Sequence, residues 1–343
     1  MGHIDAQVLA APRTLAPMSR RPELKPGEAL VRVDVAGVCG TDLAIYSGDY
    51  PVPLPRVLGH EFVGTVEDVV GDSGHGWAGQ RVVCEINDTC RSRGAEPCPA
   101  CAADMPTHCH RRVTLGIDGW EGAFATHVVA PVANLHAVPD AITSDAAVFV
   151  EPLAAAFQTF EMTPVAEGEW VVVLGAGRLG VLVCAAAAAL GARVLAVARK
   201  PSSLDRARAM GADEACSAGE AAARIRQLTG GLMARLVVEA TGTADGVSRA
   251  LELVRPRGTV ALKTTCGLPP PDLDLTRAVV NEIRFAGSRC GPFPKALDAL
   301  ATGAIPVESL VEARFPLGEL GLALDAARSR AKVLIYPSPK SRE

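Results

Sequence analysis

Hydrophobic residues follow two different patterns along the chain, and the first pattern occupies about the first 145 residues. There, short apolar or alternating segments rich in β-branched residues are separated by Gly and Pro, as in PVPLP and GDSGHGWAG. Apolar positions with a period of two are typical of strands that bury one face. We expect strands over residues 29–35, 62–70 and 80–86, and therefore an antiparallel, barrel-like β domain.

The second pattern begins near Ala146, where apolar segments alternate between the lengths of strands and of helices. Strands are predicted over residues 169–174, 193–198, 236–239, 259–263 and 283–286, and helices over residues 179–190, 203–210 and 246–254. Such alternation indicates a doubly wound parallel sheet. Helices over residues 295–301 and 317–328 and a strand over residues 332–336 complete the prediction. The expected class is α/β, with residues 148–286 as the parallel-sheet domain and residues 1–147 with 287–343 as the other domain.

Composition and charge exclude several classes of protein. Hydrophobic residues make up 49% and charged residues 21% of the 343 residues, the ordinary mix of a soluble globular protein. The chain has 34 Lys and Arg and 38 Asp and Glu, which gives a net charge of −4. This charge argues against nucleic acid and anionic membranes as partners. The longest apolar stretch, residues 181–192, is too short to span a bilayer. No apolar signal-type segment opens the chain, and we expect a cytoplasmic protein.

A glycine-rich loop, GAGRLG at residues 175–180, directly follows a predicted strand and opens a predicted helix. The first glycine permits a tight turn, the second lets backbone approach a pyrophosphate, and the third lets helix and strand pack closely. The helix N-terminus offers N–H groups and a positive dipole end to phosphates. Strand, loop, helix and second strand occur in this order, which predicts a nicotinamide dinucleotide site. Its residues are Gly175, Ala176, Gly177, Arg178, Leu179 and Gly180.

The end of the second predicted strand bears on the choice between NAD and NADP. An NAD site has a carboxylate about 20 residues past the loop, which bonds the ribose 2′-hydroxyl. Here Ala198 occupies that place, and Arg199 and Lys200 follow it. A small residue followed by Arg leaves room for a 2′-phosphate and supplies a bidentate donor. We therefore expect NADP(H) to be favoured over NAD(H), the alternative being a solvated Arg-Lys pair at a helix start.

Gly242, Lys263 and Thr264 follow two of the later predicted strands. The carboxyl ends of parallel strands face the crevice in which dinucleotides bind. These three residues are therefore expected near the nicotinamide or the ribose.

Five of the ten cysteines lie between Cys84 and Cys109, at spacings that favour a metal site over disulfide bonds. Cys98 and Cys101 form a CPAC knuckle that can present two thiolates to one tetrahedral zinc ion, and Cys90 and Cys109 lie on arms able to fold back onto it. Four protein ligands leave no open position, so this site would be structural. The alternative is a set of free thiols. The flanking arginines either offset the thiolate charge or are solvated: Arg91, Arg93, Arg111 and Arg112.

A second group of candidate ligands is suited to catalysis. Cys39 and Thr41 lie in GVCGTD after a predicted strand, His60 and Glu61 lie in GHE, and Glu151 begins a helix at the domain junction. Thiolate, imidazole and carboxylate together suit zinc with one position left for water or substrate. Taken singly, Cys39 and His60 are more often a buried thiol and a core histidine.

The motifs GVCGTD, GHE, a four-cysteine loop, EPLA and GAGRLG occur in this order over nearly the whole chain. The sequence thereby resembles the zinc-dependent medium-chain dehydrogenase/reductase superfamily, and within it the alcohol, polyol and threonine dehydrogenase-like branch. The resemblance implies a GroES-like barrel catalytic domain, an inserted Rossmann domain, and a homodimer or homotetramer paired through Rossmann edge strands. It also implies that Cys39, His60 and either Glu61 or Glu151 bind catalytic zinc, and that Thr41 contacts the substrate oxygen. The four clustered cysteines would bind structural zinc.

The sequence departs from this family at two places. Seven residues, rather than two, separate Cys90 from Cys98, and we expect the polar segment 91–97 to loop outward with the site preserved, a vacated site being the alternative. Relatives often carry a proton-relaying histidine where this chain has Ala44. The alcohol proton must then leave through bound water, the ribose or a nearby carboxylate.

The expected activity is reversible hydride transfer between a nicotinamide cofactor and a secondary alcohol or ketone, such as a polyol, sugar or amino alcohol. Two other functions remain open at this point: a zinc-free type of quinone or enone reductase, and a non-catalytic nucleotide-binding scaffold or redox sensor. The presence of Cys39, His60 and Glu61 argues against the reductase.

Overall fold

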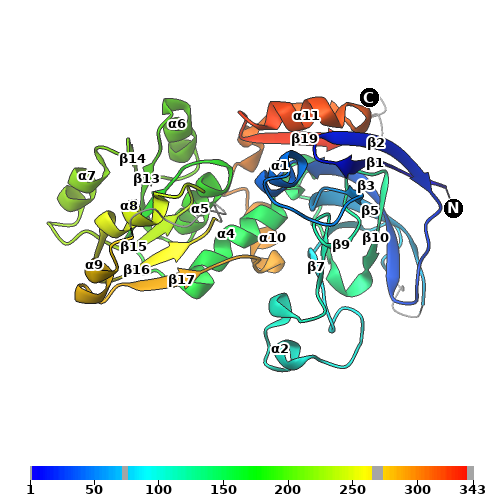
Figure 1. Ribbon diagram of the computed structural model, residues 1–343, viewed down its shortest axis with the longest axis horizontal. Coiled ribbons are helices and arrows are strands. Elements are labelled where there is room, and N and C mark those ends of the chain that lie inside the picture. The colour runs from blue at the N-terminus through cyan, green and yellow to red at the C-terminus, as the bar shows by residue number, and fades with distance from the viewer. Residues whose placement is uncertain (1, 72–75, 265–272, 338–343) are drawn as a thin grey trace. The chain divides into compact units, whose positions relative to one another are not determined.

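The computed structural model describes residues 2–71, 76–264 and 273–337 (Figure 1). The chain divides into two compact units, residues 1–151 with 307–343 and residues 152–306. The boundaries expected from the sequence, after residues 147 and 286, differ from these. Residues 287–306 belong to the second unit because they pack on the helix α4 (Val150–Met162). Gly291 lies so close to Ala154 that a Cβ there would come within 1.9 Å of its carbonyl oxygen, and Lys295 pairs with Glu161 at 2.6 Å.

The first unit is built on a seven-stranded sheet of order β11-β6-β5-β3-β19-β18, in which β10 also pairs with β3. All of its pairs are antiparallel except β18 with β19. A second sheet has the order β2-β1-β4. The strands are β1 (Ile4–Ala11), β2 (Thr14–Arg20), β3 (Glu28–Gly37), β4 (Arg56–Val57), β5 (Glu61–Val69), β6 (Arg81–Cys84), β10 (His127–Pro131), β11 (Leu135–Ala137), β18 (Val311–Pro316) and β19 (Lys332–Tyr336). The strand β19, which is the last in the described part of the chain, therefore lies beside β3.

Short helices and a small lobe complete the first unit. The helix α1 (Gly40–Ser47) follows β3, α3 (Ser144–Ala147) precedes α4, and α11 (Leu320–Ala327) packs on β18 and β19. The predicted helix over 317–328 thus begins as a 3-10 turn, Leu317–Glu319. The lobe contains α2 (Pro99–Ala102), the 3-10 turn Pro106–His108, and a small sheet of β7 (Asn87–Asp88), β8 (Val113–Leu115) and β9 (Gly119–Trp120).

The second unit is a six-stranded, wholly parallel sheet of order β14-β13-β12-β15-β16-β17. This order is that of a Rossmann fold, and it reverses direction at β12, where dinucleotides bind. The strands are β12 (Trp170–Leu174), β13 (Arg193–Val197), β14 (Glu214–Cys216), β15 (Ala234–Glu239), β16 (Val254–Leu262) and β17 (Arg284–Gly287). The other helices are α5 (Arg178–Ala189), α6 (Pro201–Ala209), α7 (Ala221–Leu228), α8 (Gly246–Leu253), α9 (Leu275–Val280) and α10 (Phe293–Ala301).

The core of the second unit explains why its strands have continuous apolar sequences. Val172, Leu195 and Val237 on three neighbouring strands are fully buried against helix residues such as Ile225 and Leu251. The α/β class and the doubly wound sheet are confirmed. The largest difference between predicted and observed bounds is at β16, which begins at Val254 rather than at residue 259. Among the described residues, no helix combines the length and apolar character needed to cross a membrane.

Candidate active site

Cys39, His60 and Glu61 lie together in the first unit, with their ligand atoms all within 4.8 Å of one another. Cys39 precedes α1, directly after β3, and Glu61 is the first residue of β5, paired with Gly37 across the sheet. Gly59 adopts a φ of +95°, which favours glycine and turns the chain so that His60 meets Cys39. The pairing of β3 with β5 therefore assembles the predicted ligand group from residues about 20 positions apart.

Asp42, which the sequence interpretation did not assign to the site, organises these ligands. Its buried carboxylate accepts the N–H groups of Cys39 at 2.8 Å and of Gly59 at 3.1 Å. It also lies 3.4 Å from Nδ1 of His60. A carboxylate behind a histidine fixes the ring and raises its basicity as a metal ligand. The signal in the sequence was the acid at the third helical position, typical of a capping box.

The electrostatics of this group favour a cation. Burial by itself lowers the pKa of His60, but Asp42 and Cys39 beside it raise that pKa well above its usual value. Nδ1 of His60 is buried and has no hydrogen bond of good geometry among the described residues. Sulfur, nitrogen and carboxylate oxygen form the mixed donor set that zinc prefers at catalytic sites. The residues present therefore fit a zinc ion.

Lys332, another residue absent from the sequence interpretation, is ion-paired with Glu61. Both side chains are buried, and the Lys332 amine lies 5.0 Å from the ring centroid of Phe149. Gly37 provides the space for the pair, because a Cβ there would lie 2.8 Å from both the Glu61 carboxylate and the Lys332 side chain. The Glu61 carboxylate therefore faces a buried cation as well as Cys39 and His60.

Two other predicted site residues differ in their relation to this group. The Thr41 hydroxyl is 3.9 Å from the Cys39 sulfur, so it lies beside the ligands. Glu151 lies half-buried in the first turn of α4, and its carboxylate is outside the group whose atoms approach within 4.8 Å. Of the two alternative carboxylates, the structure brings Glu61 rather than Glu151 into the ligand group.

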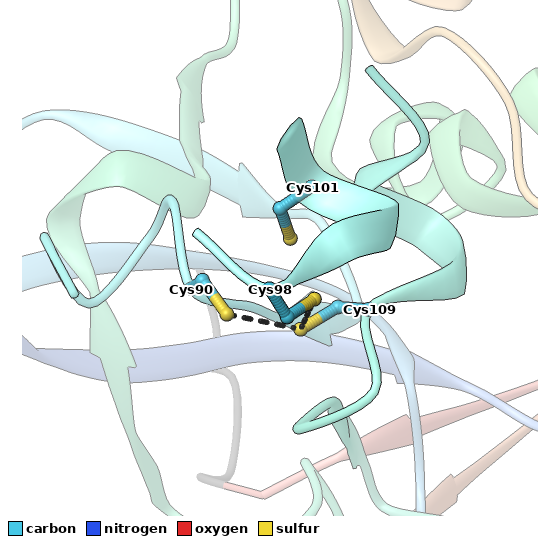
Figure 2. Close-up of side chains that lie close together, drawn as sticks. All are labelled: Cys90, Cys98, Cys101 and Cys109. Atoms are coloured by element: carbon cyan, nitrogen blue, oxygen red, sulfur yellow. Dashed lines mark hydrogen bonds between the residues drawn. The ribbon is translucent and has the colours of Figure 1, made fainter. Parts of the chain in front are cut away.

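The four clustered cysteines converge in the lobe, as Figure 2 shows. The Cys109 sulfur lies 3.4 Å from that of Cys90 and 3.8 Å from that of Cys98, and all four sulfurs are within 4.8 Å of one another. Cys98 and Cys101 bracket the start of α2, so one helical turn presents both. Segment 91–97 is mostly exposed, which agrees with the expectation that it loops outward.

Backbone N–H groups prepare this cluster for a cation. Those of Cys101 and His110 lower the pKa of the Cys98 thiol to about 6, and His110 N lies 3.4 Å from its sulfur. Burial raises the pKa of Cys101 to about 12, so this thiol stays protonated without a metal. Four converging sulfurs with N–H donors fit a structural zinc ion.

The side chains of the flanking arginines connect parts of the lobe, and the backbone N–H of Arg111 donates to the Cys109 sulfur at 3.4 Å. Arg91 donates to the carbonyl of Cys101 at 3.2 Å and to Asp104, and Arg93 pairs with Asp88 at 2.8 Å. Arg111 donates to the Glu96 carbonyl, and Arg112 to the Thr107 carbonyl. Arg91, Arg93 and Arg111 thus tie the long insert to the rest of the lobe, a role that neither expectation included.

The glycine-rich loop of the second unit has the geometry of a dinucleotide site. Gly175 has a φ of +103°, and Gly180 packs so tightly that a Cβ would lie 1.9 Å from the Gly175 carbonyl oxygen. Gly177 precedes α5 and is exposed, and a Cβ there would meet nothing within 4 Å. Open space before a helix N-terminus at the switch point of the sheet fits a pyrophosphate.

The other predicted cofactor residues lie at the carboxyl edge of the same sheet. Ala198 is half-buried directly after β13, and Arg199 and Lys200 after it are exposed. Gly242 donates its N–H to the Thr264 hydroxyl at 2.9 Å, and the Lys263 amine donates to the carbonyl of Arg289 at 2.8 Å. These hydrogen bonds give Gly242, Lys263 and Thr264 a role in shaping the loops, and their contacts with a cofactor stay a prediction.

Family models match both units. The alcohol dehydrogenase GroES-like domain matches residues 25–140, and the zinc-binding dehydrogenase matches residues 179–302. Over 343 aligned residues the sequence is 30% identical to the erythritol/L-threitol dehydrogenase of Mycolicibacterium smegmatis, covering 92% of each chain.

Two solved structures show the same architecture. One is a Sinorhizobium meliloti protein bound to NADP, with 26% identity, a TM-score of 0.88, and coverage of 98% of this chain and 100% of that one. The other is an alcohol dehydrogenase from Escherichia coli in complex with NADH, with 25% identity, a TM-score of 0.89 and the same coverage. The similarity therefore includes both units but does not distinguish NADP from NAD as the preferred cofactor.

Proposed function

The chain belongs to the zinc-containing medium-chain dehydrogenase/reductase superfamily, in its polyol and sugar dehydrogenase branch, and we propose its substrate and cofactor preference on that basis. As a zinc-dependent, NAD(P)-dependent oxidoreductase of the alcohol dehydrogenase type, it transfers hydride between an alcohol and a nicotinamide. The proposal is that the substrate is the secondary alcohol or ketone of a small polyol, sugar or amino alcohol. The preferred cofactor is NADP(H).

The observation that carries the catalytic part is the convergence of Cys39, His60 and Glu61 within 4.8 Å. These three residues would hold the catalytic zinc, which as a Lewis acid lowers the pKa of an alcohol oxygen. Asp42 accepts the Cys39 N–H and lies 3.4 Å from Nδ1 of His60, so it would support both of these ligands. Cys90, Cys98, Cys101 and Cys109 would hold the structural zinc.

Thr41 is the residue proposed to handle the substrate proton. Its hydroxyl lies 3.9 Å from the Cys39 sulfur, close enough to the ligands to accept a proton from an alcohol oxygen bound there. Ala44 carries no group that can pass this proton on, and its carbonyl already accepts the Ser47 hydroxyl at 3.1 Å. The proton would then leave through bound water, the cofactor ribose or a nearby carboxylate.

The NADP preference rests on the end of β13. Ala198 leaves room where NAD sites have a carboxylate, and the exposed Arg199 can form charge-assisted hydrogen bonds with a 2′-phosphate. The NADP-bound relative supports this preference, whereas the NADH-bound one shows that the fold takes either cofactor.

A second copy of the chain is the proposed partner. The strand β17 ends the described sheet, and the nearby side chains of Val279, Val280 and Phe285 are 76%, 74% and 40% exposed. An unpaired strand edge beside exposed apolar side chains is a typical pairing surface. We propose a homodimer through β17, alone or within a tetramer.

The proposed substrate class is tested by a panel of polyols, sugars, amino alcohols and ketones assayed with both cofactors by absorbance of the reduced nicotinamide. We expect turnover within this panel and a higher kcat/KM with NADP(H). Turnover confined to quinones or enones, or no turnover at two bound zinc ions per chain, would contradict the proposed substrate class.

A further inference from the structure

Glu239 is a buried carboxylate at the carboxyl end of β15, with 3% of its surface exposed. Glutamate is almost never fully buried unless its charge is compensated by partners. The sequence interpretation assigned it no role, and it is not among the candidate metal ligands of the described residues. Its partners therefore indicate what the charge does.

Three donors from two loops converge on this carboxylate. Oε1 accepts the Thr241 N–H at 2.7 Å and the Thr241 hydroxyl at 2.5 Å, and Oε2 accepts the Thr264 hydroxyl at 2.9 Å. The Thr264 oxygen in turn accepts the Gly242 N–H. Glu239 thus connects the loop after β15 with Thr264, the second residue after the end of β16.

The same loop contacts the dinucleotide loop directly. A Cβ on Gly175 would lie 2.7 Å from the carbonyl group of Ala240 and from the Thr241 nitrogen. The Ala240 N–H donates to the Leu174 carbonyl, the residue before Gly175, at 2.8 Å. The Ala240–Thr241 backbone therefore packs directly against the first glycine of the GAGRLG turn.

Gly246 provides the space in which the carboxylate lies. A Cβ on Gly246 would lie 2.4 Å from Oε1 of Glu239 and 2.5 Å from the Thr241 hydroxyl. The start of α8 is therefore packed against the hydrogen-bonded group, so a shift of Glu239 has no free volume to enter on that side.

We propose that Glu239 is a positioning residue for the dinucleotide site, acting through Thr241 and Thr264. The charge is needed because all three groups donate to it. The single oxygen of a glutamine could still accept both groups of Thr241, but its NH₂ cannot accept the Thr264 hydroxyl, so that hydrogen bond would be lost. Glu239 holds the Ala240–Thr241 backbone against Gly175 and so keeps the phosphate-binding turn in shape before the cofactor arrives. This inference rests on the proposed dinucleotide binding.

The test is direct titration of wild type and variants with NADPH and NADH by nicotinamide fluorescence, together with thermal unfolding of each protein. The variants are Glu239→Gln, Thr241→Val and Thr241→Ser, since Thr241 donates to Glu239 and is not among the residues predicted to contact the cofactor. The matched control is Glu252→Gln, which removes an exposed carboxylate from α8 of the same unit. Losing one charge-assisted hydrogen bond from the group should raise Kd for both cofactors about tenfold.

We expect Glu239→Gln and Thr241→Val to raise Kd in folded protein, and Thr241→Ser and Glu252→Gln to keep it near the wild-type value. A purely structural role would lower Tm in the first two variants and leave Kd unchanged, which would overturn the inference. If Glu239→Gln does not fold, the two Thr241 variants decide by the same criterion. Failure of the wild type to bind either dinucleotide would overturn the proposed function, and this inference with it.

Discussion

The amine of Lys332, on the last strand of the chain, is ion-paired with the carboxylate of Glu61, one of three side chains that converge as candidate zinc ligands. The two residues are 271 positions apart and are brought together because β5 and β19 both pair with β3. A buried cation and a bound metal would both compensate the charge of the same carboxylate.

Replacing Lys332 by Met should destabilise the zinc-free protein by ~3–5 kcal/mol, because it leaves the buried Glu61 carboxylate without its partner. Zinc at the Glu61 site would replace part of the lost compensation, so the loss should be smaller in zinc-loaded protein. Denaturant unfolding of the zinc-free and the zinc-loaded protein measures this loss of unfolding free energy. The control is Glu61→Gln combined with Lys332→Met, which should recover stability in the zinc-free form. An equal loss with and without zinc would mean that metal and amine do not share the carboxylate.

Asp42→Asn should weaken zinc binding at the catalytic site by roughly 10- to 100-fold, because the carboxylate that supports the zinc ligands is lost. An asparagine accepts one of the two N–H groups from Cys39 and Gly59 and turns its own NH₂ toward the other. Competition of the protein with a zinc chelator measures the affinity. Asp49→Asn, an exposed acid just after α1, is the matched control. Equal zinc retention in both variants would remove Asp42 from the site.

Cys98→Ala should lose one zinc ion per chain and lower Tm, because a structural metal site contributes folding free energy directly. Metal analysis and thermal unfolding provide the two readouts. Cys84→Ala removes a buried thiol that lies outside the cluster, and it should keep the wild-type zinc content. Unchanged zinc in Cys98→Ala would show that the four sulfurs converge without holding a metal.

Arg199→Ala should remove most of a preference for NADP(H), roughly ten- to a hundredfold, and leave affinity for NAD(H) nearly unchanged. Ala198→Asp should reverse the preference, because a carboxylate repels the 2′-phosphate. Values of kcat/KM for both cofactors, repeated at rising salt, test this, since an exposed charge pair is screened. Arg208→Ala on α6 is the control for loss of a nearby exposed cation. A wild-type preference for NAD(H) would make Arg199 and Lys200 a solvated helix start.

Much of the architecture could be predicted because its signals are local. The GAGRLG turn, the alternation of strands and helices, and the CPAC knuckle each depend on residues within one short segment. Weaker local signals were missed, such as β14, which has only three residues, and β1 and β2 at the start of the chain.

The residues that complete the sites could not be found in this way. Lys332 and Glu239 are ordinary charged residues in the sequence, and their importance appears only when distant strands pair or neighbouring strand ends meet. The choice between Glu61 and Glu151 likewise needed the register of β3 with β5, which places Glu61 opposite Gly37 and leaves Glu151 outside the ligand group. Tertiary contact, rather than residue type, decided each of these cases.

The most direct test of the central claim is zinc content measured together with turnover, in wild type and in Cys39→Ser. We expect about two zinc ions per wild-type chain. Cys39→Ser should lose turnover and catalytic-site zinc while keeping the structural zinc and the affinity for the reduced cofactor, because the dinucleotide loop lies in the other unit. Near-normal turnover in Cys39→Ser, or a wild type with one zinc ion that is held by the four cysteines, would contradict catalysis by zinc at Cys39, His60 and Glu61.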